Sequence, residues 1–185
     1  YNMVVGEEVK NPHGFAESPY SEWYENSLRF SGSTVANHHT ATYGQKPFSD
    51  FGPEWEAGLA HWDPVEWASR FAATGARYVV LVAKHMEGYC LWPSAVPNPH
   101  RPNWNSSRDV VGELASAVRQ AGMKFGLYYS GGFDATWNDH PIGSFGDVPL
   151  AVPRGGYPEY AAAQVRELID RYQPSVLWND ICWPA

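Results

Sequence analysis

Three apolar segments of the 185-residue sequence each end in side chains that could do chemistry. His85 follows the first segment, Tyr128 lies at the end of the second, and Asp180 comes two residues beyond the third. A carboxylate at position 180, beside the indole of Trp178, could attack an anomeric carbon or act as a general base. The alternative for Asp180 is a structural one, the N-cap of a following helix.

The segment Glu22-Trp23-Tyr24 places a carboxylate next to two aromatic rings. Sugars need both kinds of partner, because their C–H faces stack on aromatic rings while their hydroxyls need polar groups. A helix with a buried Trp23 beside a solvated Glu22 explains the same pattern equally well. Both interpretations of this segment stay open.

A metal centre has little support in the sequence. His85 and Glu87 would need further ligands at fixed spacing, and no strand ends in His-x-His. His38 and His39 are adjacent, which suits one ligand better than two. There is no phosphate-binding glycine loop and no Gly-x-Ser-x-Gly nucleophile elbow. We therefore expect no metal and no cofactor.

Three helix–strand units must position these side chains. Apolar residues at helical spacing, each time followed by a short apolar strand, predict helices over 64–74, 110–121 and 158–172 and strands over 77–83, 123–129 and 175–178. Asp63 and Pro64 suit the N-cap and first position of the first helix. Strands that are apolar almost throughout are expected to be buried on both faces, which in alternation with helices predicts a parallel sheet.

Long loops rich in Gly, Pro and aromatic residues follow the first two strands, over residues 88–107 and 131–157. Long loops after parallel strands are where a (β/α)₈ barrel builds its active site. The same barrel would bring His85, Tyr128 and Asp180 to one rim, as a catalytic face. For each of the three alone, a polar residue at a strand end is usually only the start of a loop.

Composition excludes several classes of protein. With 44% hydrophobic and 18% charged residues the chain is not disordered, and no apolar run approaches the ~18 residues of a membrane span. The net charge of −7 argues against a nucleic-acid partner, because such affinity depends largely on Lys and Arg. Cys90 and Cys182 are too few for a disulfide framework and are expected to be two buried thiols.

No linker, charge run or low-complexity segment divides the chain, so we expect one domain fragment over residues 1–185. Residues 1–60 are expected to be irregular, apart from a helix-like segment near 23–29. The sequence favours neither a secreted nor a cytoplasmic location, and it leaves the oligomeric state open.

Taken in order, these segments resemble the glycoside hydrolase family 29 α-L-fucosidases over nearly the whole chain. Eight segments carry the resemblance: Ser-Glu-Trp-Tyr at 21–24, Trp-Asp-Pro at 62–64 with Trp-Ala at 67–68, Gly-Ala-Arg-Tyr-Val-Val-Leu at 75–81, Lys-His at 84–85, Gly-Tyr-Cys-Leu-Trp-Pro-Ser at 88–94, Arg-Asp-Val-Val-Gly-Glu-Leu at 108–114, Lys-Phe-Gly-Leu-Tyr-Tyr-Ser-Gly-Gly at 124–132 and Leu-Trp-Asn-Asp at 177–180. Each alone is modest, but the ordered set is highly specific.

The resemblance implies a retaining hydrolase that removes terminal α-L-fucose from oligosaccharides or glycoconjugates. It implies that Asp180 is the nucleophile and that Glu22, Trp23, His85 and Tyr128 contact the sugar. A second carboxyl group would serve as the acid/base. Glu22, Glu87 and Asp134 are available carboxylates, but the resemblance implies an acid/base residue outside this chain.

Two departures from the family pattern affect what we expect. The family reads Lys-His-His-Asp-Gly where this chain has Met86 and Glu87 at the third and fourth positions. Met86 replaces a sugar-contacting histidine, and an uncompensated loss of that hydrogen bond would cost ~1–3 kcal/mol. The family's first barrel strand, its later strands and its C-terminal β-domain are also missing from residues 1–185. We therefore expect an incomplete barrel that is inactive when expressed alone.

Two other functions compete with this interpretation. A non-catalytic carbohydrate-binding protein on the same scaffold would also tolerate Met86 and a missing acid/base residue. A metal-dependent sugar isomerase on a similar barrel is the third alternative, and it would lose activity on chelation.

Overall fold

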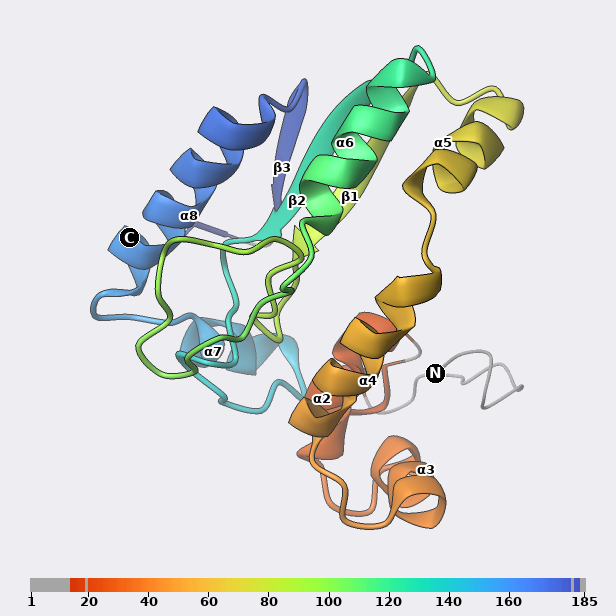
Figure 1. Ribbon diagram of the computed structural model, residues 1–185. Coiled ribbons are helices and arrows are strands. Elements are labelled where there is room, and N and C mark those ends of the chain that lie inside the picture. Colours follow the sequence, from red (N-terminus) through yellow and green to blue (C-terminus); the bar gives the residue numbers. More distant parts are fainter. Residues whose placement is uncertain (1–13, 19, 181, 184–185) are drawn as a thin grey trace.

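The structure is a computed structural model that describes residues 14–18, 20–180 and 182–183. Its centre is a three-stranded parallel sheet in the order β1-β2-β3, formed by β1 (Tyr78–Lys84), β2 (Lys124–Ser130) and β3 (Val176–Asp180). The strands lie side by side with their carboxyl ends at one edge (Figure 1). The predicted parallel sheet is therefore confirmed.

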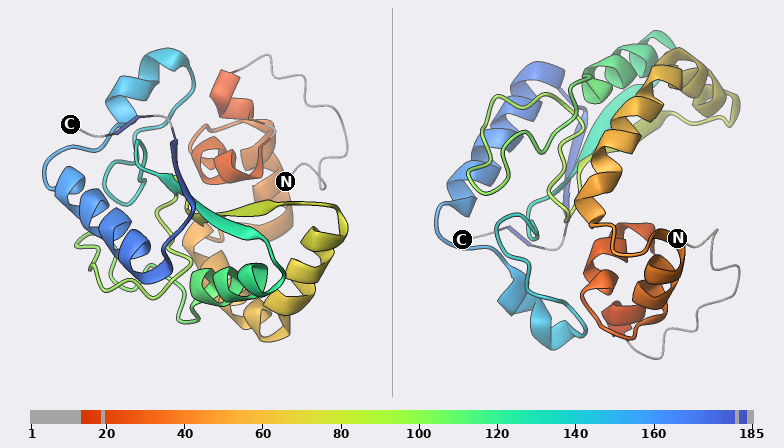
Figure 2. Two further views of the ribbon diagram at one scale, coloured as in Figure 1. Left: turned by 90° about the horizontal axis from the view of Figure 1, so that it is seen from above. Right: turned by 60° about the horizontal axis from the view of Figure 1, so that its bottom comes forward.

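Each strand is preceded by a helix, as the sequence predicts. The three helices are α5 (Pro64–Ala73), α6 (Val110–Gln120) and α8 (Tyr157–Tyr172). They are arranged around one side of the curved sheet (Figure 2). The chain thus forms an α/β domain with helices on one face of a parallel sheet.

The main core lies between these helices and the sheet. Val111, Leu114 and Val118 form one face of α6 at helical spacing, and all three are almost fully buried. They pack in one cluster with Phe125 and Leu127 of β2, which are fully buried. Burial of a side chain of this size contributes about 1.5–3 kcal/mol. Because the helices pack on the sheet through such apolar stripes, the helical spacing in the sequence predicts this layer correctly.

The expectation that all three strands are buried on both faces is wrong for β1 and β3. On β1, Tyr78 is 64% exposed and Val82 is 42% exposed. On β3, Val176 is 50% exposed and Trp178 is 58% exposed. Val79 and Leu81 of β1 and Leu177 of β3 pack against the core on the helix side, so the opposite face of these two strands is largely exposed among the described residues. Only β2, the central strand, is buried beyond its first residue.

The expectation that residues 1–60 are irregular is also wrong in part. Beyond the expected helix α2 (Tyr24–Leu28), the structure has α3 (Thr34–Tyr43) and α4 (Phe51–Gly58). These helices form a separate layer below the sheet (Figure 1). No residue of α4 is fully buried, and its apolar residues Phe51 and Trp55, one turn apart, line a cleft instead of the core. Residues 1–13 and 19 lie outside the described residues.

Short elements complete the chain. The loop 88–107 has no helix, whereas 131–157 includes α7 (Val148–Ala151). The 3₁₀ helices are η1 (Gly14–Glu17), η2 (Ser21–Trp23), η3 (Phe48–Asp50), η4 (Leu59–His61) and η5 (Phe145–Asp147). No helix in the described part of the chain is long and apolar enough to cross a membrane. Both cysteines are free thiols; Cys90 is buried as expected, but Cys182 is only partly buried.

The start of α5 offers a first stability prediction. The Asp63 side chain accepts hydrogen bonds from the backbone N–H groups of Val65 and Glu66, at 2.8 and 3.2 Å. Asp63→Ala should therefore lower the free energy of unfolding by about 1 kcal/mol, measured by denaturant titration. Asp50, before α4, makes no capping bond, so Asp50→Ala is the matched control. Equal losses in the two variants would contradict the capping role.

Candidate active site

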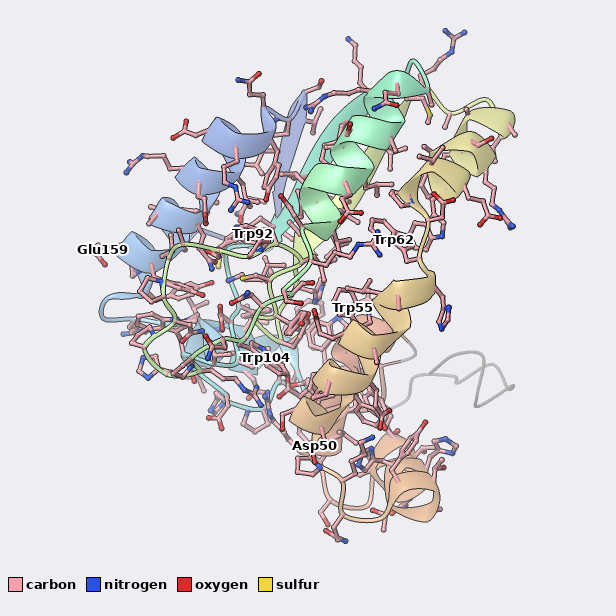
Figure 3. All side chains as sticks on the ribbon, viewed as in Figure 1. Asp50, Trp55, Trp62, Trp92, Trp104 and Glu159 are labelled. Carbon is pink, nitrogen blue, oxygen red and sulfur yellow. The ribbon has the colours of Figure 1, made fainter. Side chains whose placement is uncertain are left out.

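A cleft of about 860 Å³ opens where the strands end, between the uncovered face of the sheet and α4. Its polar lining residues are Ser21, Glu22, Glu25, His85, Glu87, Tyr128 and Asp180. Its aromatic lining residues are Phe48, Phe51, Trp55, Tyr89, Trp104 and Trp178. Trp55 on α4 and Trp104 in the loop 88–107, both labelled in Figure 3, each meet the Tyr89 ring edge-on, with centroids 5.5 and 4.9 Å away. The cleft thus combines carboxylates, an imidazole and ring faces.

Asp180 and Tyr128 are joined by a direct hydrogen bond. The Tyr128 hydroxyl donates to Oδ2 of Asp180 at 2.7 Å. Burial and the neighbouring Asp180 carboxylate raise the pKa of Tyr128 well above its ordinary value, so the phenol keeps its proton and remains the donor. This contact orients one oxygen of the carboxylate.

Asp180 is better held than the sequence predicts. It is the last residue of β3, paired in register with Ser130 of β2, rather than two residues beyond the strand. The apolar segment ends at Trp178, but the hydrogen-bonded ladder continues through two polar residues. A ladder position fixes the carboxylate more firmly than a loop position would.

His85 lies against Tyr128. The two rings stack nearly parallel, with centroids 5.4 Å apart and an interplanar angle of 7°. A register shift between Val82 and Lys84 turns the end of β1, so that Lys84 is buried on the helix side and His85 lines the cleft. Burial lowers the pKa of His85 below its ordinary value, although Glu22 and Asp180 oppose this effect.

The predicted Glu22–Trp23 pair is divided between two environments. Glu22 lines the cleft, whereas Trp23 stacks on Phe15 at 4.7 Å and meets the edge of Phe133. The indole of Trp178 does line the cleft, and Trp178 lies two residues before Asp180 in the same strand. The spacing Trp-Asn-Asp in one strand puts positions 178 and 180 on one face, and that is the signal which identifies Trp178.

Met86 packs as an apolar residue. It is almost fully buried in a cluster with Phe133 and Ile142, and Trp23 packs against the same cluster. Its thioether therefore contacts apolar side chains rather than an unpaired polar group.

A buried ion pair supports the end of β1. Lys84 Nζ donates to Oδ2 of Asp134 at 2.7 Å, and both side chains are completely buried. The ammonium lies over the rings of three tyrosines, Tyr129, Tyr157 and Tyr160. Asp134 is thus committed to this pair and does not line the cleft. Among the described residues, the cleft carboxylates besides Asp180 are Glu22, Glu25 and Glu87.

Gly88 is required beside that pair. Its φ of +76° is in the left-handed region, and a Cβ there would lie 2.5 Å from Oδ1 of Asp134. Asp134 lies in the loop after β2, where a Cβ at Gly131 would overlap Asn179 and a Cβ at Gly132 would overlap Cys182. The ion pair therefore ties the end of β1 to a loop packed tightly against the end of β3, which carries Asp180.

Glu25 and Glu87 both line the cleft, and the sequence does not predict that they share it. Burial raises the pKa of both, that of Glu87 to about 7. No group of three or more His, Cys, Asp or Glu side chains in the described ranges is arranged to hold a metal ion. The chemistry available to the cleft is that of carboxylates, an imidazole and a phenol.

A parallel α/β sheet whose strand ends deliver carboxylates and aromatic rings to one cleft is typical of enzymes acting on sugars. The comparison with protein families supports this class, because the alpha-L-fucosidase family model matches residues 7–185. The chain belongs to the alpha-L-fucosidase family.

Individual relatives agree with this assignment. The chain is 39% identical over 141 residues to a tissue alpha-L-fucosidase of Rattus norvegicus, and 37% identical over 147 residues to one of Homo sapiens. Each match covers 74% of this chain and 28% of the relative, so the chain spans little more than a quarter of these proteins. Thermotoga maritima alpha-fucosidase, solved in complex with fucose, is 44% identical with a TM-score of 0.85, over 92% of this chain and 40% of that one.

Proposed function

We propose that the whole protein that carries this chain is a retaining α-L-fucosidase, with Asp180 as its nucleophile. The observation that carries the proposal is the hydrogen bond from Tyr128 to the Asp180 carboxylate, at the strand ends of a cleft that His85 and Glu22 also line. Membership of the alpha-L-fucosidase family and the fucose complex of the Thermotoga maritima relative support the substrate.

In this mechanism the Asp180 carboxylate attacks C1 of an α-L-fucoside, and the bond from C1 to the leaving oxygen breaks. The Tyr128 hydroxyl holds Oδ2, so the other oxygen of Asp180 is the attacking atom. Glu22 and His85 bind sugar hydroxyls, and the ring of Trp178 faces the sugar. Trp23 contributes to sugar binding indirectly, because its packing on Phe15 and Phe133 holds the segment that carries Glu22.

The acid/base group comes from another part of the protein. It lies roughly 5–5.5 Å from the nucleophile in a retaining enzyme, protonates the leaving oxygen, and then removes a proton from the water that attacks C1. Two inversions at C1 leave the α configuration unchanged.

The three strands belong to a (β/α)₈ barrel in this proposal, and residues 1–185 form part of its single catalytic domain. The helices α5, α6 and α8 lie along one face of the sheet (Figure 2), as on the outside of a barrel, and the cleft lies at the carboxyl ends of the strands. The match to 40% of the Thermotoga maritima chain supports a larger complete domain.

Hydrolysis of an aryl α-L-fucoside by the whole protein tests the function directly. Turnover should be accompanied by release of α-L-fucose as the first anomer seen by NMR. Release of β-L-fucose would contradict the retaining mechanism. Binding of fucosides without turnover would instead favour the non-catalytic carbohydrate-binding protein.

Tyr128→Phe should reduce kcat/KM by about 10- to 100-fold, because a hydrogen bond to a charged group contributes ~1.5–3 kcal/mol. The ring is retained, so its stacking with His85 should persist and thermal unfolding should change little. The measurement is kcat/KM with an aryl α-L-fucoside alongside a thermal unfolding curve. Unchanged kcat/KM would show that the Tyr128–Asp180 contact has no role in catalysis.

A further inference from the structure

His85 and Glu87 face each other on the turn that follows β1. Nδ1 of His85 lies 3.8 Å from Oε2 of Glu87, and both side chains are mostly buried. Nδ1 makes no hydrogen bond with the described residues, although it is buried. The turn itself is fixed, since Gly88 N–H donates to the His85 carbonyl and the Trp104 indole donates to the Glu87 carbonyl, at 3.0 and 2.8 Å.

The surroundings favour the uncharged form of each group. Burial is the main cause in both cases, lowering the pKa of His85 and raising the pKa of Glu87 to about 7. Glu22 and Asp180 favour a charged His85, and Lys84 opposes it. For Glu87, the charges of Glu25 and Asp134 raise the pKa further, and Lys84 lowers it.

Resting on the proposed function, we propose that Glu87 is a positioning residue for His85: the two side chains close from 3.8 Å to hydrogen-bond distance when the sugar binds and share a proton at Nδ1, so that Nε2 donates a hydrogen bond to the sugar. When the pair holds this proton, it lies either on Glu87, which then donates to Nδ1, or on Nδ1, which then donates to the Glu87 carboxylate. Nε2 carries a hydrogen in both arrangements.

Loss of one proton from the pair turns Nε2 of His85 from a hydrogen-bond donor into an acceptor. The remaining N–H is then held at Nδ1 by the Glu87 carboxylate, which leaves Nε2 as an acceptor. A sugar oxygen that accepts from Nε2 is bound well only by the protonated pair. Affinity should therefore be highest below the pKa of the pair and fall as the pH rises through about 7.

The test is calorimetric titration of the whole protein with L-fucose at pH 6 and pH 8, in buffers of different ionisation enthalpy. The dissociation constant should rise about tenfold over this range, and binding near pH 7.5 should take up a proton. Glu87→Gln removes the titrating group but keeps a hydrogen-bonding side chain. It should reduce the pH dependence to less than about twofold and remove its share of the proton uptake.

Glu25→Gln is the matched control, because Glu25 lines the same cleft and burial also raises its pKa, while its ion pair is with Arg29. This variant should keep a pH-dependent affinity, because Glu87 still titrates, but its midpoint should move to lower pH because the charge of Glu25 no longer raises the pKa of Glu87. If Glu87→Gln does not fold, Glu87→Asp is expected to keep the pH dependence, because it retains a titrating carboxylate.

A Glu87→Gln protein that binds fucose with the proton uptake of wild type would overturn the inference while leaving the proposed function intact. Wild-type protein that neither hydrolyses an aryl α-L-fucoside nor binds L-fucose would instead overturn the proposed function, and this inference with it.

Discussion

Replacing Asp180 by glycine in the whole protein should lower kcat for an aryl α-L-fucoside on the order of 10⁴-fold or more. The variant loses the group that forms the bond to C1, and no other cleft carboxylate receives the hydrogen bond from Tyr128. Added azide should restore part of the turnover, because the small anion enters the space left by the side chain and attacks C1 directly. A single displacement inverts the configuration, so the product should be the β-L-fucosyl azide.

The control for azide is Tyr128→Phe, which keeps the Asp180 carboxylate. Azide should not raise its turnover, because no space opens beside C1. Wild-type turnover in Asp180→Gly, or equal azide effects in the two variants, would contradict the role of Asp180.

Replacing Lys84 by methionine should lower the free energy of unfolding by about 3–5 kcal/mol. The change leaves the Asp134 carboxylate completely buried without its ammonium partner, still accepting bonds from the backbone and hydroxyl of Thr136. Denaturant titration measures the effect. A second change, Asp134→Leu, should recover part of the loss, because the two buried polar groups are then both gone.

Arg70→Met is the matched control for that experiment. Arg70 also pairs with a carboxylate, Glu66, but both side chains are more than half exposed. Its loss should change the free energy of unfolding by less than ~1 kcal/mol. A similarly small change in Lys84→Met would show that the buried pair contributes little to the fold.

The layered part of the fold could be predicted because its residues repeat at regular spacing. The stripe of Val111, Leu114 and Val118 and the capping Asp63 correctly predict α6 and the start of α5. The helix α4 was not predicted in this way, because it puts no fully buried residue into the core and its Phe51 and Trp55 line the cleft instead. Ser33 marks the start of α3 in the sequence, since its hydroxyl caps the helix by accepting a hydrogen bond from Ala36 N–H.

The sequence predicts a site residue only where that residue lies at the end of a predicted strand. His85, Tyr128 and Asp180 each follow from such an end, and the parallel register brings them together. Glu87 could not be assigned from sequence, because its position opposite Nδ1 of His85 depends on the turn fixed by Gly88 and on the shifted register of β1. Trp23 does not line the cleft, and its packing against Phe133, which is 110 residues away in sequence, could not be predicted either.

The most direct measurement is to react the whole protein with 2-deoxy-2-fluoro-α-L-fucosyl fluoride, digest it, and locate the attached sugar by mass spectrometry. A good leaving group lets the nucleophile react, while the fluorine slows hydrolysis of the sugar ester. We predict one fluorofucosyl group, on the peptide that contains Asp180. Attachment to any other residue, or turnover of fucosides without a trapped sugar in this experiment, would contradict it.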